Sequence, residues 1–252
     1  MISTTRDEYG LKLKPFPLLV TIVLGIGLPY LAGYLALLTS RVLGVASPHG
    51  PILHWLYLQH GFQCLLALIA IFIVRRFVPA DYGLHWPHGK TYIGPAIFWG
   101  VVAGVVMTLV DYAPEIWMHR APHLDYPLNT ANVVGWLGFE GIYVGPTEEI
   151  PFRALLVTYL AATMPGRVRL FNFEMNWAGI IVALLFALLH AENFWTRLWP
   201  LALGQQIYAF ALGVAYAYWL EKSRSVVAPA IGHNVGDVTE YAILFAWVGF
   251  ST

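Results

Sequence analysis

Apolar residues recur in long stretches along nearly the whole chain, and short polar segments separate them. A helix needs about 20 consecutive apolar residues to cross the hydrocarbon core of a bilayer. On this criterion the sequence predicts seven spans, at roughly 17–39, 55–74, 92–110, 134–163, 176–194, 201–220 and 226–248. The fourth stretch is longer than one straight crossing requires, and Gly145 and Pro146 interrupt it. It could therefore form two pieces, with an eighth crossing or a re-entrant segment.

Composition points the same way. Of the 252 residues, 58% are hydrophobic and only 11% are charged, whereas soluble domains carry about 25% charged residues. We therefore expect an all-α, polytopic transmembrane bundle of seven or eight helices, with residues 1–252 forming a single membrane-embedded domain. Lys and Arg (14) balance Asp and Glu (14), and no basic run suggests a nucleic-acid partner. The expected surroundings are a lipid bilayer.

Positive charge alternates between the predicted loops and so predicts an orientation. Cytoplasmic loops of membrane proteins are enriched in Lys and Arg. Ten such residues fall on the side of the N-terminus and three on the other side. The ten are Arg6, Lys12, Lys14, Arg75, Arg76, Lys90, Arg167, Arg169, Lys222 and Arg224, and the three are Arg41, Arg120 and Arg197. We expect seven crossings with a cytoplasmic N-terminus, and the compact, short-looped chain indicates a prokaryotic plasma membrane.

Polar residues inside a span usually face the bundle interior and mark function. The fourth stretch contains Glu148, Glu149 and Arg153. Glu149 and Arg153 are four residues apart, so they share a helix face and can pair. Glu148 points about 100° away and stays unpaired. Burial would favour its protonated form, as suits a general base that works near neutral pH. The alternative is a network that only ties helices together.

Two later spans contain histidines. His190 lies near the end of one span, with Asn193 about a turn beyond it. His233 and Asp237 are four residues apart on the last span, and Asn234 lies beside them. His190 could instead be a satisfied interior residue, and His233 with Asp237 could be only a structural pair within the helix. Two glycines within 231–237 would let a neighbouring helix or a substrate backbone come close.

Together these residues suggest hydrolysis. Glu148 would deprotonate a water that His190 helps to hold, and His233 would donate to the oxyanion formed at a carbonyl. Glu148, His190 and His233 are also plausible zinc ligands. However, the sequence contains no HExxH helix, and Asp237 is the one candidate for a second-shell carboxylate. With straight crossings, the depths of His190 and His233 would differ by about 10 Å, so a tilt or a broken span is needed to bring them together.

The motifs EEIPFR (148–153), FALLH (186–190) and HNVGD (233–237) resemble those of the CPBP family of intramembrane endopeptidases, the CAAX-protease and bacteriocin-processing group. The resemblance covers about the last 100 residues and places the motif-bearing catalytic part at 134–248. It implies a helical bundle that cleaves peptide bonds of membrane-associated peptides or proteins. Glu148 would be the base, Glu149 would pair with Arg153, His190 would share the water, and His233 with Asp237 would form the oxyanion side.

The chain departs from the family pattern at two positions, and two other function classes stay open. Ala154 replaces a common Gly, and Asp237 replaces the commoner Asn, which an aspartate can match as a donor only when protonated. Family members have been described as zinc enzymes and as glutamate proteases; we favour the glutamate mechanism with no cofactor. A proton-coupled transporter or channel would require two related halves, and apart from His60 and Gln63 the first three spans are not densely polar. An inactive scaffold is the other alternative.

Overall fold

The computed structural model describes residues 9–44, 52–170 and 173–251. Arg6, which contributes to the predicted charge asymmetry, lies outside these residues. Each predicted span is mostly helical, with a turn at 189–192 in the fifth, so the predicted all-α membrane bundle is confirmed. The number of crossings stays a prediction. The elements in chain order are α1 (Pro15–Leu43), α2 (Ile52–Val74), α3 (Ile93–Asp111), α4 (Ala113–Trp117), α5 (Thr130–Gly138), η1 (Phe139–Tyr143), α6 (Val144–Glu149), η2 (Ile150–Val157), α7 (Thr158–Thr163), β1 (Arg167–Leu170), β2 (Phe173–Asn176), α8 (Trp177–Leu188), α9 (Asn193–Thr196), α10 (Trp199–Ser223) and α11 (Val227–Ser251).

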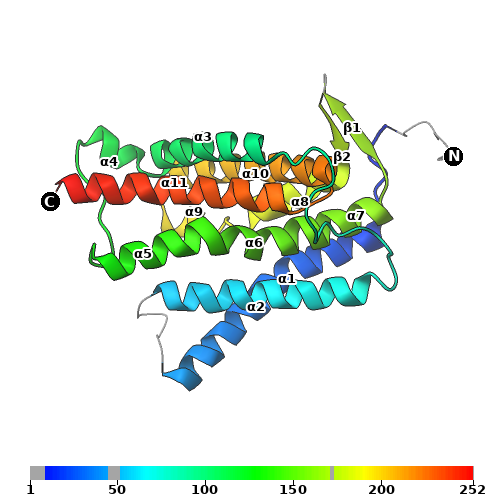
Figure 1. Cartoon of the computed structure of the whole chain (residues 1–252), viewed down its shortest axis with the longest axis horizontal. Coiled ribbons are helices and arrows are strands. Elements are labelled where there is room, and N and C mark those ends of the chain that lie inside the picture. The colour runs from blue at the N-terminus through cyan, green and yellow to red at the C-terminus, as the bar shows by residue number, and fades with distance from the viewer. Residues whose placement is uncertain (1–8, 45–51, 171–172, 252) are drawn as a thin grey trace.

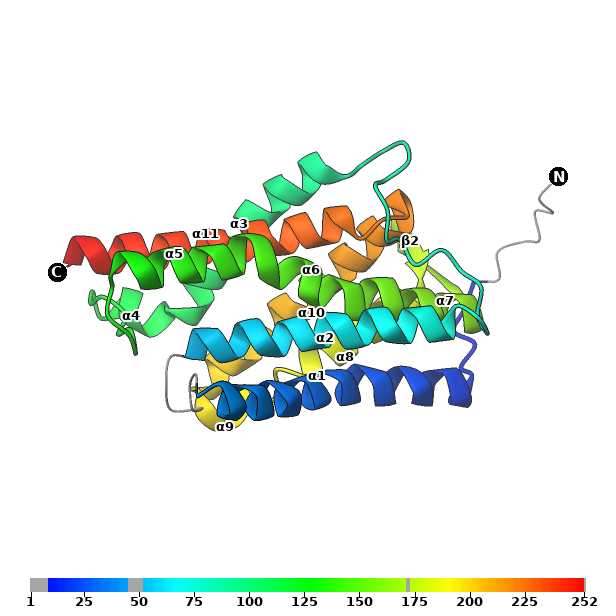
Figure 2. The same cartoon turned by 60° about the horizontal axis from the view of Figure 1, so that its bottom comes forward.

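The helices run roughly along one axis (Figure 1). The α3–α11 pair lies on one side, the α1–α2 pair lies on the other, and the run from α5 to α7 passes between them (Figure 2). The ribbon β1–β2 is a short antiparallel addition to the predicted helical fold, with Arg167 opposite Asn176. Arg167 contacts Glu174 and Glu221, both at 2.6 Å, which ties the ribbon to α10.

The outside of this bundle is apolar, as expected for a protein whose solvent is lipid. Many large hydrophobic side chains are exposed, including Leu19, Phe72 and Trp99. Within the described ranges, four helices are long and apolar enough to cross a membrane: Pro15–Leu43, Ile52–Val74, Ile93–Asp111 and Trp177–Thr196. The protein is therefore an integral membrane protein.

Helices α3 and α11 approach each other through glycines. A Cβ added to Gly100 would lie 2.8 Å from the carbonyl oxygen of Gly232, and one added to Gly104 would overlap that of Gly236. Lipid supplies little hydrophobic drive for association, so such close backbone packing contributes much of the attraction between helices. The close approach of α3 and α11 thus depends on Gly100 and Gly104. Of the two glycines in 231–237, Gly232 faces α10, where an added Cβ would lie 2.7 Å from the Trp219 ring, and one added to Gly236 would meet α3 only at 3.6 Å.

The run from 130 to 163 stays helical across Gly145 and Pro146, so the alternative that this stretch divides into two pieces is not what the structure has. A proline has no N–H, so it leaves a carbonyl four residues earlier without its helical partner. Asn234 of α11 donates to the carbonyl of Ile142 (3.2 Å), four residues before Pro146. Gln63 of α2 donates to the carbonyl of Thr147 (3.3 Å), four residues before Pro151. Neighbouring helices thus satisfy the groups that the prolines free.

Candidate active site

Glu149 and Arg153 form the ion pair that their spacing predicts. The Arg153 Nε atom lies 3.1 Å from Glu149 Oε2, and both side chains are almost completely buried. The guanidinium carbon of Arg153 lies 4.5 Å from the centre of the Phe186 ring and 5.4 Å from that of Tyr216. These aromatic faces attract the cation and shield the ends of the guanidinium that make no hydrogen bond.

His233 is held between two carboxylates. Its Nδ1 atom lies 2.7 Å from Glu149 Oε1, and its Nε2 atom lies 3.2 Å from Asp237 Oδ2. The Tyr216 ring stacks on the imidazole, with 5.6 Å between the ring centres. Both nitrogens can serve their carboxylates only as N–H donors, so this surrounding favours the charged imidazolium. The ring is thereby fixed in position and orientation.

Glu148 faces a histidine that the sequence-based site left out. Its Oε1 atom lies 3.0 Å from Nε2 of His60 on α2. The Nδ1 atom of His60 lies 3.0 Å from the carbonyl oxygen of Leu56, which can only accept a hydrogen. Nε2 and Oε1 must therefore share a second proton. The other oxygen, Glu148 Oε2, lies 3.8 Å from His233 Nε2.

His190 lies in the turn just after α8, which ends at Leu188. Its Nδ1 atom lies 3.1 Å from the carbonyl oxygen of Phe186, which assigns the proton to Nδ1 and leaves Nε2 as an acceptor. The Phe186 ring packs against the imidazole, with 5.2 Å between the centres. The spacing of the FALLH motif thus puts one aromatic ring between the Arg153 guanidinium and His190.

The two predicted supporting asparagines make structural contacts. Asn234 accepts a hydrogen bond from the backbone N–H of Gly145 (2.7 Å), in addition to its bond to Ile142. Asn193 donates to Gln205. Neither asparagine lines the cavity described next.

One cavity of about 380 Å³ is lined by the four residues assigned to catalysis, Glu148, His190, His233 and Asp237. The predicted difference in depth between His190 and His233 does not separate them, because both line this one cavity. Glu140 and Glu240 also line it. These two carboxylates and His60 were missed. Their polarity inside apolar spans was the available signal, but no motif spacing connects them to the other residues.

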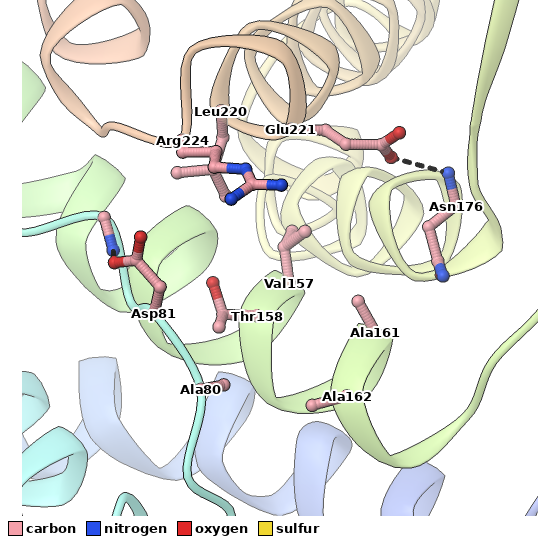
Figure 3. A pocket seen from close by; sticks show the side chains of 11 residues that line it. Ala80, Asp81, Val157, Thr158, Ala161, Ala162, Asn176, Leu220, Glu221 and Arg224 are labelled. Atoms are coloured by element: carbon pink, nitrogen blue, oxygen red, sulfur yellow. Dashed lines mark hydrogen bonds between the residues drawn. The ribbon is translucent and has the colours of Figure 1, made fainter. Parts of the chain in front are cut away.

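A second pocket of about 350 Å³ lies beside α7, between the loop that follows α2 and the end of α10 (Figure 3). None of the predicted site residues lines it. Glu221 accepts a hydrogen bond from the backbone N–H of Asn176 at 2.8 Å, drawn as the dashed line (Figure 3). The same carboxylate binds Arg167. These groups are committed to holding the β-ribbon on α10, and the pocket offers no comparable constellation.

Metal binding can be tested on the donor atoms themselves. A zinc ligand histidine needs one ring nitrogen with a free lone pair. In His233 both nitrogens face carboxylates, so Glu148, His190 and His233 do not form a ready zinc site. Across the described ranges, no cluster of three or more His, Cys, Asp or Glu residues is arranged to hold a metal ion.

Comparison with known proteins adds one match. Residues 130–239 match the family model described as type II CAAX prenyl endopeptidase Rce1-like. The matched segment contains all eight predicted site residues, whereas His60 and Glu240 lie outside it. No curated protein and no solved structure matches the chain.

Proposed function

Because residues 130–239 match the family model of Rce1-like type II CAAX prenyl endopeptidases, we propose that this integral membrane protein is an intramembrane endopeptidase. It hydrolyses peptide bonds of membrane-associated peptides or proteins. One observation carries the proposal for the site: the Glu148 carboxylate and the rings of His190 and His233 line a single cavity. The residues that line this cavity come from separate helices. A shared cavity matters because a hydrolase needs a base, a water and an oxyanion donor within a few ångströms of one carbonyl.

In the proposed reaction, Glu148 is the general base. Its Oε1 atom is engaged by His60, so Oε2 is the oxygen that accepts the proton of water. Oε2 and His233 Nε2 are 3.8 Å apart, and one oxygen atom at about 2.8 Å from each would fit between them. The water oxygen attacks the carbonyl carbon while its proton passes to Glu148. Glu148 then gives that proton to the leaving nitrogen as the C–N bond breaks.

His233 stabilises the oxyanion of this reaction, and His190 holds the attacking water. The imidazolium of His233 donates toward the oxyanion that forms on the attacked carbonyl, and the Asp237 and Glu149 carboxylates keep it charged. Asp237 therefore acts by orienting His233, so it need not be a donor itself. His190 presents Nε2 as an acceptor for the second hydrogen of the water.

We also propose that no metal takes part. The support is the occupation of both His233 nitrogens by carboxylates. A zinc ion on Glu148, His190 and His233 would require His233 to give up Glu149 or Asp237 and to lose its proton. Donation to an oxyanion requires less: His233 keeps both protons and its contact with Glu149, and only the Nε2 hydrogen is shared between Asp237 and the incoming oxygen.

The experiment uses the full chain reconstituted in proteoliposomes with a library of quenched fluorogenic peptides, with and without a lipid anchor. In H₂¹⁸O, mass spectrometry should find the label in the new carboxyl group. Glu148→Gln should abolish cleavage and leave thermal stability nearly unchanged. Glu115→Gln is the matched control, since Glu115 pairs with Arg120 outside the cavity. A library that stays uncut, or a Glu148→Gln variant that cuts as well as wild type, would overturn the proposal.

The orientation follows from charge, and we propose that the N-terminus is cytoplasmic. The loop that follows α2, the β-ribbon and the α10–α11 turn lie at the same end of the bundle (Figure 1). They carry Arg75, Arg76, Arg167 and Arg224, which supports this end as the cytoplasmic one. In a Cys64→Ala background, a membrane-impermeant maleimide added to intact cells should label Ala121→Cys and leave Arg224→Cys unlabelled. The reverse pattern would invert the topology.

A further inference from the structure

Two carboxylates in the cavity have no ion-pair partner among the described residues. Glu140, in the π-helical turn η1, is 7% exposed and lines the cavity. It has no hydrogen bond or ion pair to any residue that the structure describes. Glu240 of α11 lines the same cavity and likewise has no such partner in the described chain. A buried acid without a partner is expensive in a membrane protein and is a mark of function.

The other carboxylates of the cavity are all matched. Asp237 faces His233 at 3.2 Å, and Glu148 faces His60 at 3.0 Å. Asp111 lies 3.3 Å from Arg197 and accepts a hydrogen bond from Tyr208 at 2.9 Å. Among the carboxylates that line the cavity, Glu140 and Glu240 are thus the two without an ion-pair partner in the described chain. A ligand with a positively charged group would complement this negative region of the cavity.

The spacing along α11 relates these acids to the reacting bond. His233, Asp237 and Glu240 follow one another at i, i+4 and i+7, so they share one face of the helix. Glu240 lies about 10 Å along the axis from His233. An extended peptide rises about 3.3 Å per residue, so this distance corresponds to about three residues. The long side chain of a lysine or arginine could span part of the distance between the cleaved bond and Glu240.

We propose that Glu140 and Glu240 form a subsite for a lysine or arginine side chain of the substrate, within about three residues of the cleaved bond. This inference rests on the proposed endopeptidase function and adds a substrate class to it. The tyrosines at this end, Tyr112 and Tyr241, line the same cavity and offer rings against which a cationic side chain packs. The subsite lies toward the end of the bundle opposite the basic loops, where Arg197 is already paired with Asp111.

The test compares matched peptides that differ at one position near the cleaved bond, with Lys, Gln or Glu. Wild type should prefer the Lys peptide over the Gln peptide by about 10- to 100-fold in kcat/KM, as one charge-assisted contact provides. Glu140→Gln and Glu240→Gln, singly and together, should erase most of this preference and leave the Gln peptide unaffected. Glu192→Gln is the control, because Glu192 is exposed and does not line the cavity.

A binding measurement separates recognition from turnover. In the Glu148→Gln background, the uncut Lys peptide should bind more weakly once Glu140 and Glu240 are also changed to Gln. Equal kcat/KM for Lys and Gln peptides in wild type, or an unchanged Lys preference in the double variant, would overturn the subsite. Either result would leave the endopeptidase intact. Failure of the proposed function would look different, since no peptide of any charge would be cut.

Discussion

Removing the Arg153 guanidinium should destabilise the protein strongly, because it leaves a carboxylate in the core without its main counter-ion. Arg153 is 1% exposed, Glu149 is fully buried, and their closest atoms are 3.1 Å apart. Breaking a buried ion pair from one side costs about 3–5 kcal/mol. His233 still contacts the other oxygen of Glu149 at 2.7 Å, so we expect the lower end of that range for Arg153→Met, about 3 kcal/mol.

The assay is thermal unfolding of the purified protein in detergent. A loss of about 3 kcal/mol corresponds to a fall of about 6–12 °C in Tm for a chain of this size. Glu149→Gln combined with Arg153→Met should recover part of the loss, because no uncompensated charge then remains. Arg120→Met is the control, since its side chain is 60% exposed, and it should change stability by less than about 0.5 kcal/mol. A Tm for Arg153→Met equal to that of the control, or a double variant less stable than the single one, would refute the reasoning.

Four further outcomes are expected. Chelators such as 1,10-phenanthroline should leave peptide cleavage unchanged, and loss of activity that zinc restores would favour the metal alternative. His60→Phe should lower kcat by about 100-fold, because Glu148 loses the group that orients it; an unchanged kcat would contradict this. Gly104→Leu should cost about 1–3 kcal/mol through overlap with α11, while Gly27→Leu, which meets open space, should be tolerated; equal stability of the two would count against the close packing. Finally, the hydrogen bond from Arg167 lowers the pKa of Glu174, so the contribution of this pair is present above the unfolded pKa and is lost as pH falls through the folded pKa. The protection factors of the β-ribbon amides should fall as the pH drops from about 5 to about 3, and protection factors that stay constant over this range would contradict it.

The fold was predictable because lipid restricts the choices. A backbone in hydrocarbon must satisfy its own hydrogen bonds, so each long apolar run has to be a helix. Contacts within one helix could also be predicted, because four-residue spacing brings side chains together. Glu149 lies 3.1 Å from Arg153, and His233 lies 3.2 Å from Asp237. The four-residue spacing puts each pair on one helix face, within reach of a long side chain, even though Arg153 lies in the π-helical segment η2.

Contacts between helices were not predictable in the same way. His60 and Glu148 are 88 residues apart in the sequence, and His233 and Glu149 are 84 apart. Which faces meet depends on packing that no local spacing encodes. The same limit explains why the sequence left a break at Pro146 open. A proline in isolation predicts a break, but here the amide of Asn234, from another helix, supplies the missing hydrogen bond.

These inter-helix amides also explain why the site assembles in one register. Gln63 donates to the carbonyl that Pro151 leaves free, and it lies three residues from His60 on α2. Asn234 donates to the carbonyl that Pro146 leaves free, and it lies beside His233 on α11. A side-chain amide reaches its carbonyl only within a narrow range of distance and angle. Each of these two hydrogen bonds therefore fixes the axial position and rotation of one neighbouring helix relative to the 130–163 run, which carries Glu148. A slip of either helix would leave a backbone carbonyl unsatisfied in an apolar interior. The groups that look like helix breakers thus align His60 with Glu148, and His233 with Glu149.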